Sequence, residues 1–307
     1  MKRIGSLLIV IGMVLAGAAA FAQGPIRVGS KNFTEQLILG NLIVTALQEA
    51  GLEVVDNTNL GGTGVVRDSL LTGEIDVYAE YTGTAISNFF RDVEADIPEG
   101  ASGDAQLSYE TVSSLDEDMN DLVWLDAAPA NNTYAIAVSA PFAEEHGVSS
   151  AADLAAYINE GNAVRLATND EFAQRPDGLQ SFEDTYGFAF GSDNLLIIAG
   201  GASQQTLQAM AEGQVDAAMV FATDGALQAY DVVVLSDEDG AQPVFQPAPV
   251  VRGEVLRANP EIAEVLNPIF ATLDAETLQE LNARVEVDGE NVRDVVRDFL
   301  QEHGFSD

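Results

Sequence analysis

The chain has 307 residues, 47% of them hydrophobic, which is enough to bury a large core in one or two globular domains. It contains 13 basic against 49 acidic residues, and the net charge of −36 argues against nucleic acids and anionic lipid surfaces as partners. Because there is no cysteine, disulfides, thiol nucleophiles and thiolate metal ligands are excluded.

The first 22 residues have the pattern of a secretory signal peptide. Lys2 and Arg3 precede an apolar run over 4–18 that is short for a membrane span, and Ala-Phe-Ala at 20–22 fits a cleavage site. We therefore expect a periplasmic mature chain that begins near Gln23 and has no lipid anchor. The alternative, an uncleaved membrane anchor, is disfavoured because no stop-transfer pattern follows.

The start of the mature chain predicts a strand, a loop and a helix. Residues 26–29 form a short apolar strand, and apolar positions from Leu37 to Leu47 follow at helical spacing. Lys31 lies in the loop and is the only lysine left after signal removal. A lysine beside a helix start is a candidate for binding an anionic group. The alternative is an exposed charge paired with Glu35.

Two stretches with the same pattern predict two similarly built lobes. In 73–84, G-E-I-D-V-Y-A-E-Y-T-G-T, apolar and polar residues alternate as in a half-buried strand that delivers Tyr81 and Thr84 to a loop. In 213–224, G-Q-V-D-A-A-M-V-F-A-T-D, glycine, aspartate and an aromatic residue recur at equal offsets, so that Phe221 corresponds to Tyr81. We expect each lobe to offer one aromatic side chain to a shared cleft.

Strands alternate with helices along the chain, which favours a layered α/β fold. Further strands are expected over 52–57, 122–125, 131–138, 165–167 and 232–235, helices over 65–71, 150–160, 260–270, 275–285 and 291–301, and a proline-rich edge segment over 242–252. We place one interlobe crossing near 128–131 and the return near 225–230. The expected layout is 23–129 for the first part of lobe I, 130–225 for the inserted lobe II, and 226–307 for the completion of lobe I.

Arg175 stands before Pro176 at an expected helix entry. A guanidinium held there can bind a carboxylate through two parallel hydrogen bonds. The alternative is an ion pair with Asp170 or Asp177.

Five segments in a fixed order resemble the periplasmic substrate-binding proteins of osmoprotectant ABC importers, the glycine betaine, choline and carnitine type of the ProX, OpuC and OsmF group. They are V-G-S-K-N-F-T-E-Q at 28–36, G-E-I-D-V-Y-A-E-Y-T-G-T at 73–84, N-N-T-Y-A-I-A-V at 131–138, F-A-T-D-G at 221–225 and A-P-V-V-R at 248–252. The resemblance implies an α/β, two-lobed type II periplasmic-binding-protein fold, with a ligand cleft between lobes joined by a two-segment hinge. It also implies a monomer that delivers its ligand to the permease and ATPase subunits of an importer.

The same resemblance assigns ligand-binding roles to individual positions. They are Lys31 and Arg175 for a ligand carboxylate, Tyr81, Tyr134 and Tyr230 for an aromatic cage, and Thr84 for a hydrogen bond. The chain departs from the family pattern at 204–207, where members often carry another tyrosine. One wall of the cage is then missing, or Phe221 replaces it.

A quaternary ammonium ligand suits such a set of residues. A trimethylammonium group has no N–H donor, so it is recognised as diffuse positive charge by aromatic faces. Lys31 and Arg175 supply positive charge for a ligand that also carries a carboxylate. We expect no cofactor, no metal site and no nucleic-acid partner.

Other interpretations stay open. An extracytoplasmic enzyme is disfavoured because the two histidines, His146 and His303, lie near no serine-nucleophile motif, and no spacing singles out a catalytic carboxylate pair. The same binding fold can also serve a different small molecule or act as a sensor. The prediction is therefore a binding protein and not an enzyme.

Overall fold

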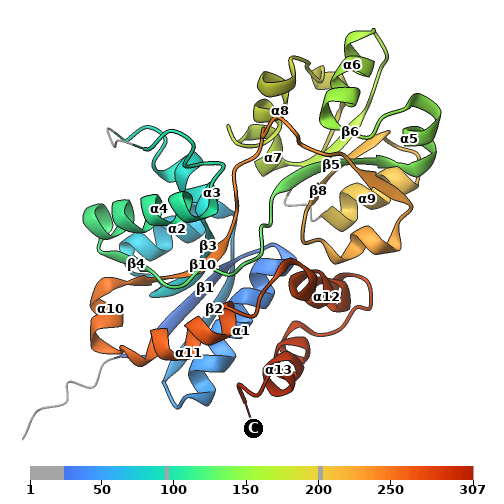
Figure 1. Ribbon diagram of the computed structural model, residues 1–307. Helices are drawn as coiled ribbons and strands as arrows, with labels where there is room; N and C mark the ends of the chain where they lie inside the picture. The colour runs from blue at the N-terminus through green and yellow to red at the C-terminus, as the bar shows by residue number, and fades with distance from the viewer. Residues whose placement is uncertain (1–23, 94–96, 200–202, 307) are drawn as a thin grey trace, which may run out of the picture.

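The computed structural model describes residues 24–93, 97–199 and 203–306, which form two α/β lobes (Figure 1). The predicted signal peptide, residues 1–22, lies outside the described residues. Each lobe contains a five-stranded sheet, and the chain passes between the lobes twice (Figure 1). Among the helices of these ranges, none has the length and apolar character that a membrane crossing requires.

The first lobe is built on a sheet with the strand order β2-β1-β3-β10-β4. Its strands are β1 (Ile26–Lys31), β2 (Val54–Gly61), β3 (Val77–Tyr81), β4 (Leu122–Trp124) and β10 (Pro247–Arg252). Its helices are α1 (Thr34–Glu49), α2 (Thr63–Thr72), α3 (Thr82–Thr84), the π-helical turn η1 (Ala85–Phe89), α4 (Ala105–Asn120), α10 (Gly253–Ala258), α11 (Glu261–Phe270), α12 (Ala275–Glu286) and α13 (Val292–Glu302). α1 packs with α11, α12 and α13 over one face of the sheet, and α2 and α4 cover the other.

The second lobe has the strand order β7-β6-β8-β5-β9. Its strands are β5 (Tyr134–Ser139), β6 (Leu166–Asn169), β7 (Leu195–Ile198), β8 (Ala217–Phe221) and β9 (Val232–Val234). Its helices are α5 (Ala140–His146), α6 (Ala151–Asn159), α7 (Asp170–Gln174), α8 (Leu179–Tyr186), α9 (Ser203–Ala211) and the 3-10 turns η2 (Ser192–Asn194) and η3 (Gly225–Ala229).

The repeated sequence pattern corresponds to a repeated structure, so the prediction of two similarly built lobes is confirmed. β3 and β8 each have a parallel neighbour on one side and an antiparallel neighbour on the other. Gly73 and Gly213, with φ of 74° and 72°, follow the preceding helix in the left-handed conformation that glycine adopts without strain. Asp76 accepts a hydrogen bond from the backbone amide of Arg27, near the start of β1, at 2.8 Å. Asp216 accepts one from the amide of Arg165, just before β6, at 2.9 Å.

β3 is buried on both faces, and not on one face as its alternating pattern predicts. Val77, Ala79 and Tyr81 pack toward the α1 side, whereas Tyr78 and Glu80 point to the side covered by α2 and α4. The Tyr78 hydroxyl donates to the Glu80 carboxylate at 2.9 Å, so the polar residues of the second face are paired with each other. Polar residues that alternate with apolar ones along a strand therefore do not indicate a solvent-exposed face when a second layer of helices covers that face.

The predicted return from lobe II near residues 225–230 is wrong. β9, Val232–Val234, pairs antiparallel with β5 in the second sheet, so lobe II continues to at least residue 234. The chain re-enters the first sheet at β10. The two crossing segments are hydrogen bonded to each other, because the Asn132 amide donates to the Phe245 carbonyl at 3.0 Å and the Phe245 amide donates to Asn131 Oδ1 at 2.7 Å. They form a two-stranded hinge (Figure 1).

The proline-rich segment is also not an edge, since β10 lies between β3 and β4. Proline lacks the N–H that an interior strand needs, which is why the sequence favours an edge. Pro247 and Pro249 escape this conflict because β4 pairs only with residues 250–252. On that side of β10 the two prolines act only as acceptors. The Pro247 carbonyl accepts a hydrogen bond from the Ala128 amide, and the Pro249 carbonyl accepts one from the Leu125 amide.

A buried ion pair holds α2, α4 and β4 together on the outer side of the first sheet. The guanidinium of Arg67 donates two hydrogen bonds to Asp116, and the indole N–H of Trp124 donates to the same carboxylate at 2.8 Å. Asp116 therefore receives donors from two elements, which compensates for its complete burial.

The two lobes touch through η3 and α12. A Cβ placed on Gly225 would lie 2.0 Å from the backbone nitrogen of Ala283, so only glycine permits this approach. Beside it, the Asn282 side chain donates to the backbone carbonyl of Thr223 at 2.8 Å. Closure of the lobes on this side thus depends on direct contact between the backbone around Gly225 and helix α12.

Candidate functional site

A pocket lies between the lobes, beside the hinge. Its lining comes from both sheets, from the crossing segments and from α12, and comprises Lys31, Phe33, Thr34, Glu35, Gln36, Thr63, Tyr81, Thr84, Asn132, Tyr134, Glu171, Arg175, Ser203, Phe221, Asp224, Phe245, Asn282 and Glu286. The free space inside is about 50 Å³, which is the room of a few water molecules. An organic ligand therefore enters only if the lobes move apart, as hinge closure in two-lobed binding proteins requires.

Aromatic rings form one wall of the pocket. The Tyr134 ring lies 4.9 Å from that of Phe221 and 5.7 Å from that of Phe245, and Phe33 meets Phe221 edge-on at 6.3 Å. Tyr81 adds a fifth ring from the end of β3. Both lobes and the crossing segment contribute, so the complete wall exists only when the lobes are together.

Lys31 lies at the carboxyl end of β1 and is 2% exposed. Its Nζ donates to Glu80 at 2.7 Å and lies 5.3 Å from the centroid of the Tyr81 ring. The alternative of an exposed Lys31 paired with Glu35 is therefore wrong. Lys31 reaches back to β3 because the adjacent parallel strand ends beside it, and its ammonium group retains two donors beyond the ion pair.

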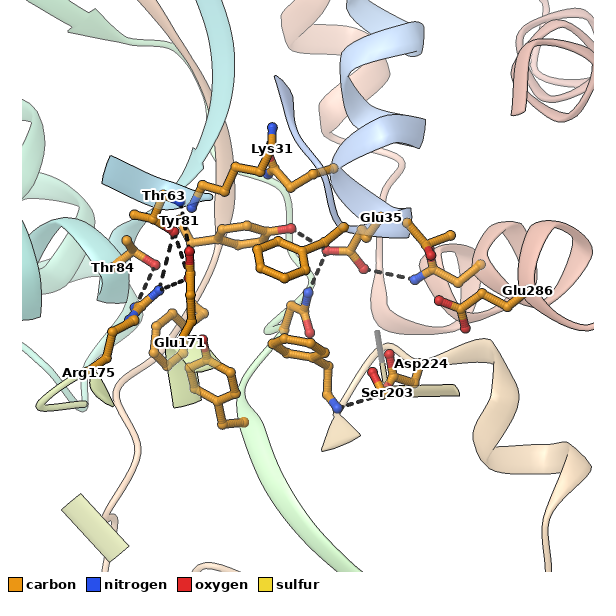
Figure 2. Close-up of a pocket in the computed structure, with 18 residues that line it drawn as sticks. Lys31, Glu35, Thr63, Tyr81, Thr84, Glu171, Arg175, Ser203, Asp224 and Glu286 are labelled. Atoms are coloured by element: carbon orange, nitrogen blue, oxygen red, sulfur yellow. Dashed lines mark hydrogen bonds and ion pairs between the residues drawn. The ribbon is translucent and has the colours of Figure 1, made fainter. Parts of the chain in front are cut away.

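Arg175 joins the lobes at one end of the pocket (Figure 2). Arg175 lies at the end of α7, whereas the sequence predicted that it would lie at the start of a helix. Its guanidinium pairs with Asp177 at 2.6 Å and with Glu171 at 3.1 Å, and it donates to the Thr84 hydroxyl of the other lobe at 3.2 Å. Glu171 in turn accepts from the amide and hydroxyl of Thr63 at 2.8 and 2.9 Å. Burial opposes ionisation of Glu171, but the positive charges nearby lower its pKa overall.

Glu35, in the first turn of α1, collects donors from four segments. One carboxylate oxygen accepts from the Tyr81 hydroxyl at 2.8 Å and from Asn132 Nδ2 at 2.7 Å. The other accepts from the Thr223 hydroxyl and from Asn282 Nδ2. Burial raises the pKa of Glu35, and the four donated hydrogen bonds oppose that rise. This carboxylate ties β3, the crossing segment, lobe II and α12 into one network.

Asp224 and Glu286 complete an acidic side of the pocket, opposite Arg175 (Figure 2). Burial, followed by the nearby charge of Glu286, raises the pKa of Asp224 well above its ordinary value. Burial also raises the pKa of Glu286, and the charge of Glu35 adds to it. Within the described residues, Glu35, Asp224 and Glu286 form no ion pair with a cation. The pocket is therefore polarised, with cations at one end and carboxyl groups at the other.

Residues 24–302 match the family model described as the substrate binding domain of the ABC-type glycine betaine transport system, OpuAC. The chain is also 44% identical to the glycine betaine-binding protein YehZ of Escherichia coli over 98% of this chain and 97% of that protein. The chain belongs to the OpuAC family. A glycine-betaine-binding protein of Pseudomonas aeruginosa is 36% identical over 96% of this chain and 94% of its own length.

The OpuAC fold is shared by the solved structure of a glycine betaine/carnitine/choline ABC transporter protein. That structure is 22% identical, covers 92% of this chain and 100% of its own, and superposes with a TM-score of 0.72. The expected type II periplasmic-binding-protein fold is thereby confirmed. OpuAC proteins are substrate-binding components of ABC transporters and not enzymes, so the chain binds a small molecule for a permease.

Six of the seven residues predicted for the site line the pocket of this OpuAC protein: Lys31, Tyr81, Thr84, Tyr134, Arg175 and Phe221. The seventh, Tyr230, is not among the described lining residues and packs against the outer core of lobe II. Thr206 lies within 204–207, the stretch where the resemblance implied a missing tyrosine. It is buried in α9, and its hydroxyl is within hydrogen-bonding distance of the carbonyls of Ser203 and Met219. The preceding turn instead presents Ser203 to the pocket.

Sequence reasoning missed several lining residues: Phe33, Glu35, Asn132, Glu171, Phe245, Asn282 and Glu286. Glu35 and Asn132 stand inside motifs that carried the family resemblance, so their polar character beside predicted site residues was an available signal. Asn282 and Glu286 lie on α12, and the nearest other lining residue in the sequence is Phe245, 37 positions before Asn282. No local pattern marks them.

Proposed function

We propose that this protein captures a quaternary ammonium osmoprotectant, such as glycine betaine, choline or carnitine, and delivers it to its permease. The observation that carries the proposal is the aromatic wall of five rings in a pocket closed by two lobes. Aromatic faces attract a methylated ammonium group through their quadrupoles and need no hydrogen-bond donor from it. The named ligands of the two relatives support the same class.

Lys31 and Arg175 support a zwitterionic ligand. Both are buried at the pocket wall, and Lys31 keeps two ammonium donors that its ion pair with Glu80 does not use. A ligand carboxylate beside Lys31 would find an oriented cation in a site of low dielectric, where such a contact is strong. Tyr81, Tyr134 and Phe221 would then contact the methylated ammonium group.

The proposed setting is the periplasm. The apolar N-terminal run and the small residues at 20–22 support export through a cleavable signal peptide, and the absence of cysteine from the sequence supports a protein without a lipid anchor. We propose that the mature protein is a monomer that docks on a permease served by ATPase subunits.

The test is titration calorimetry of the mature chain with glycine betaine, choline, carnitine and proline betaine. The control is 3,3-dimethylbutanol, which has the shape of choline but carries carbon in place of the charged nitrogen. We expect at least one quaternary compound to bind about tenfold or more tighter than the neutral control. Equal binding of choline and its neutral counterpart, with no heat from the other compounds, would reject the proposal.

A further inference from the structure

The acidic side of the pocket holds acceptors that have no donor. Asn282 is 2% exposed, and its Nδ2 is fixed by Glu35 and by the Thr223 carbonyl, which leaves Oδ1 facing no donor in the described chain. Glu286 Oε2 and Asn132 Oδ1 are likewise buried without a partner. All three line the same pocket. A buried acceptor that finds no donor costs free energy, so such groups usually await a partner.

These acceptors lie on the side of the pocket where the carboxyl groups of Glu35, Asp224 and Glu286 gather (Figure 2). Glu35 already accepts four hydrogen bonds, and Asp224 accepts from the Phe221 amide at 2.6 Å. The acceptors without a donor are therefore Oδ1 of Asn132, Oδ1 of Asn282 and Oε2 of Glu286, and the last two lie within one turn of α12. A trimethylammonium group cannot supply the missing hydrogen-bond donor, because its nitrogen carries no hydrogen.

We infer that the ligand carries a hydrogen-bond donor, a hydroxyl or an N–H, close to its ammonium group, and that Asn282 and Glu286 receive it. The inference rests on the proposed function and narrows it. Within the quaternary ammonium class, the site selects compounds with a donor over those that present only methyl groups. The rejection of a compound lacking the donor follows from leaving buried acceptors unpaired.

The first test compares choline with propyltrimethylammonium by calorimetry on the mature chain. The two cations have the same shape, and only the hydroxyl of choline is replaced by a methyl group. We expect choline to bind about tenfold tighter. A second pair, N,N-dimethylglycine against glycine betaine, replaces one N-methyl group by an N–H, and the loss of methyl contact should be offset by the new donor. Equal affinity of choline and propyltrimethylammonium overturns the inference and leaves the proposed function intact.

Two variants locate the selecting residue. Glu286→Met removes the acceptor at similar size, and the preference for choline should fall to roughly parity. Glu280→Met makes the same change on an exposed position of α12 and should keep the preference. An unchanged preference in Glu286→Met would overturn the assignment of the donor to Glu286. Failure of every compound to bind would reject the proposed function itself and this inference with it.

Discussion

The carboxylate of Glu35 at the start of α1 accepts a hydrogen bond from the hydroxyl of Thr223 after β8, although 188 residues separate them. The two residues belong to different lobes, and the bond is buried. The same carboxylate holds Tyr81 of the aromatic wall, so the position of a wall residue is coupled to contact between the lobes.

Replacement of Thr223 by valine should weaken closure without changing side-chain volume. The variant removes one of four donors to Glu35, and a hydrogen bond to a carboxylate contributes about 1.5 kcal/mol or more, so ligand affinity should fall roughly tenfold. Calorimetry with the tightest ligand measures the change, and Thr72→Val, an exposed threonine of α2, is the control. Unchanged affinity in Thr223→Val would show that this bond does not contribute to closure.

Gly225→Ala should hold the lobes apart. The added Cβ would meet the backbone of Ala283 at 2.0 Å, which α12 can relieve only by moving away. We expect a larger radius of gyration in X-ray scattering with saturating ligand, and affinity reduced by about tenfold or more. Gly191→Ala is the matched control, because its Cβ would meet nothing closer than 3.9 Å. A compact, fully binding Gly225→Ala protein would contradict the prediction.

Tyr134 should act through its ring and not through its hydroxyl. The ring packs against Phe172, Phe221 and Phe245, whereas its hydroxyl has no hydrogen bond within the described chain. Tyr134→Phe should therefore bind a quaternary ammonium ligand within about threefold of the natural protein, and Tyr134→Leu should lose roughly tenfold. Equal losses in both variants would assign the contribution to the hydroxyl instead.

Removal of Lys31 should destabilise the fold as well as the site. Glu80 is completely buried, and Lys31→Met leaves its charge unpaired, at a cost of about 3 kcal/mol in unfolding free energy. The double variant Lys31→Met/Glu80→Gln should recover most of this loss in urea unfolding. If this double variant still binds glycine betaine with the affinity of the natural protein, Lys31 has only a structural role.

Asp224 should make stability depend on pH in a defined direction. Because burial raises its pKa in the folded protein, its contribution is fully present below the ordinary pKa of about 3.8 and is lost as pH rises through the raised value. Asp224→Asn mimics the protonated form, so its stability advantage over the natural protein should grow from pH 4 upward. Asp193→Asn, on the exposed η2 turn, should follow the natural protein. An advantage independent of pH would contradict the raised pKa.

The sequence predicted the strand that ends at Tyr81 and its counterpart at Phe221, because both carry a strong local pattern. It did not predict the return of the chain to lobe I, because β9 is three valines whose pairing partner, β5, lies about 100 residues earlier. Five of the six pocket residues were found because they stand at strand ends or in motifs, and Arg175 was found because it precedes a proline. Tyr230 follows the η3 turn and packs against the core of lobe II, and an aromatic residue between two elements gives no local signal of whether it faces a cleft or a core.

The acidic side of the pocket could not be predicted from the sequence at all. Glu35 appeared only in the alternative interpretation, as the partner of an exposed Lys31, since the two are close in the chain. In the structure β1 and β3 are adjacent strands, and Lys31 pairs with Glu80 instead. Asn282 and Glu286 reach the pocket only because α12 packs across η3. In a chain with 49 acidic residues, composition offers no means of choosing these carboxylates among the exposed ones.

Trp124, the single tryptophan of the chain, donates its indole N–H to Asp116 on the far side of the first sheet and takes no part in the pocket. Tryptophan emission of the natural protein should consequently respond little to ligand binding, because its one indole is buried within a single lobe and away from the pocket. A reporter must be introduced, and Phe245→Trp would put an indole on the crossing segment, where emission wavelength and quenching follow the opening of the cleft in real time.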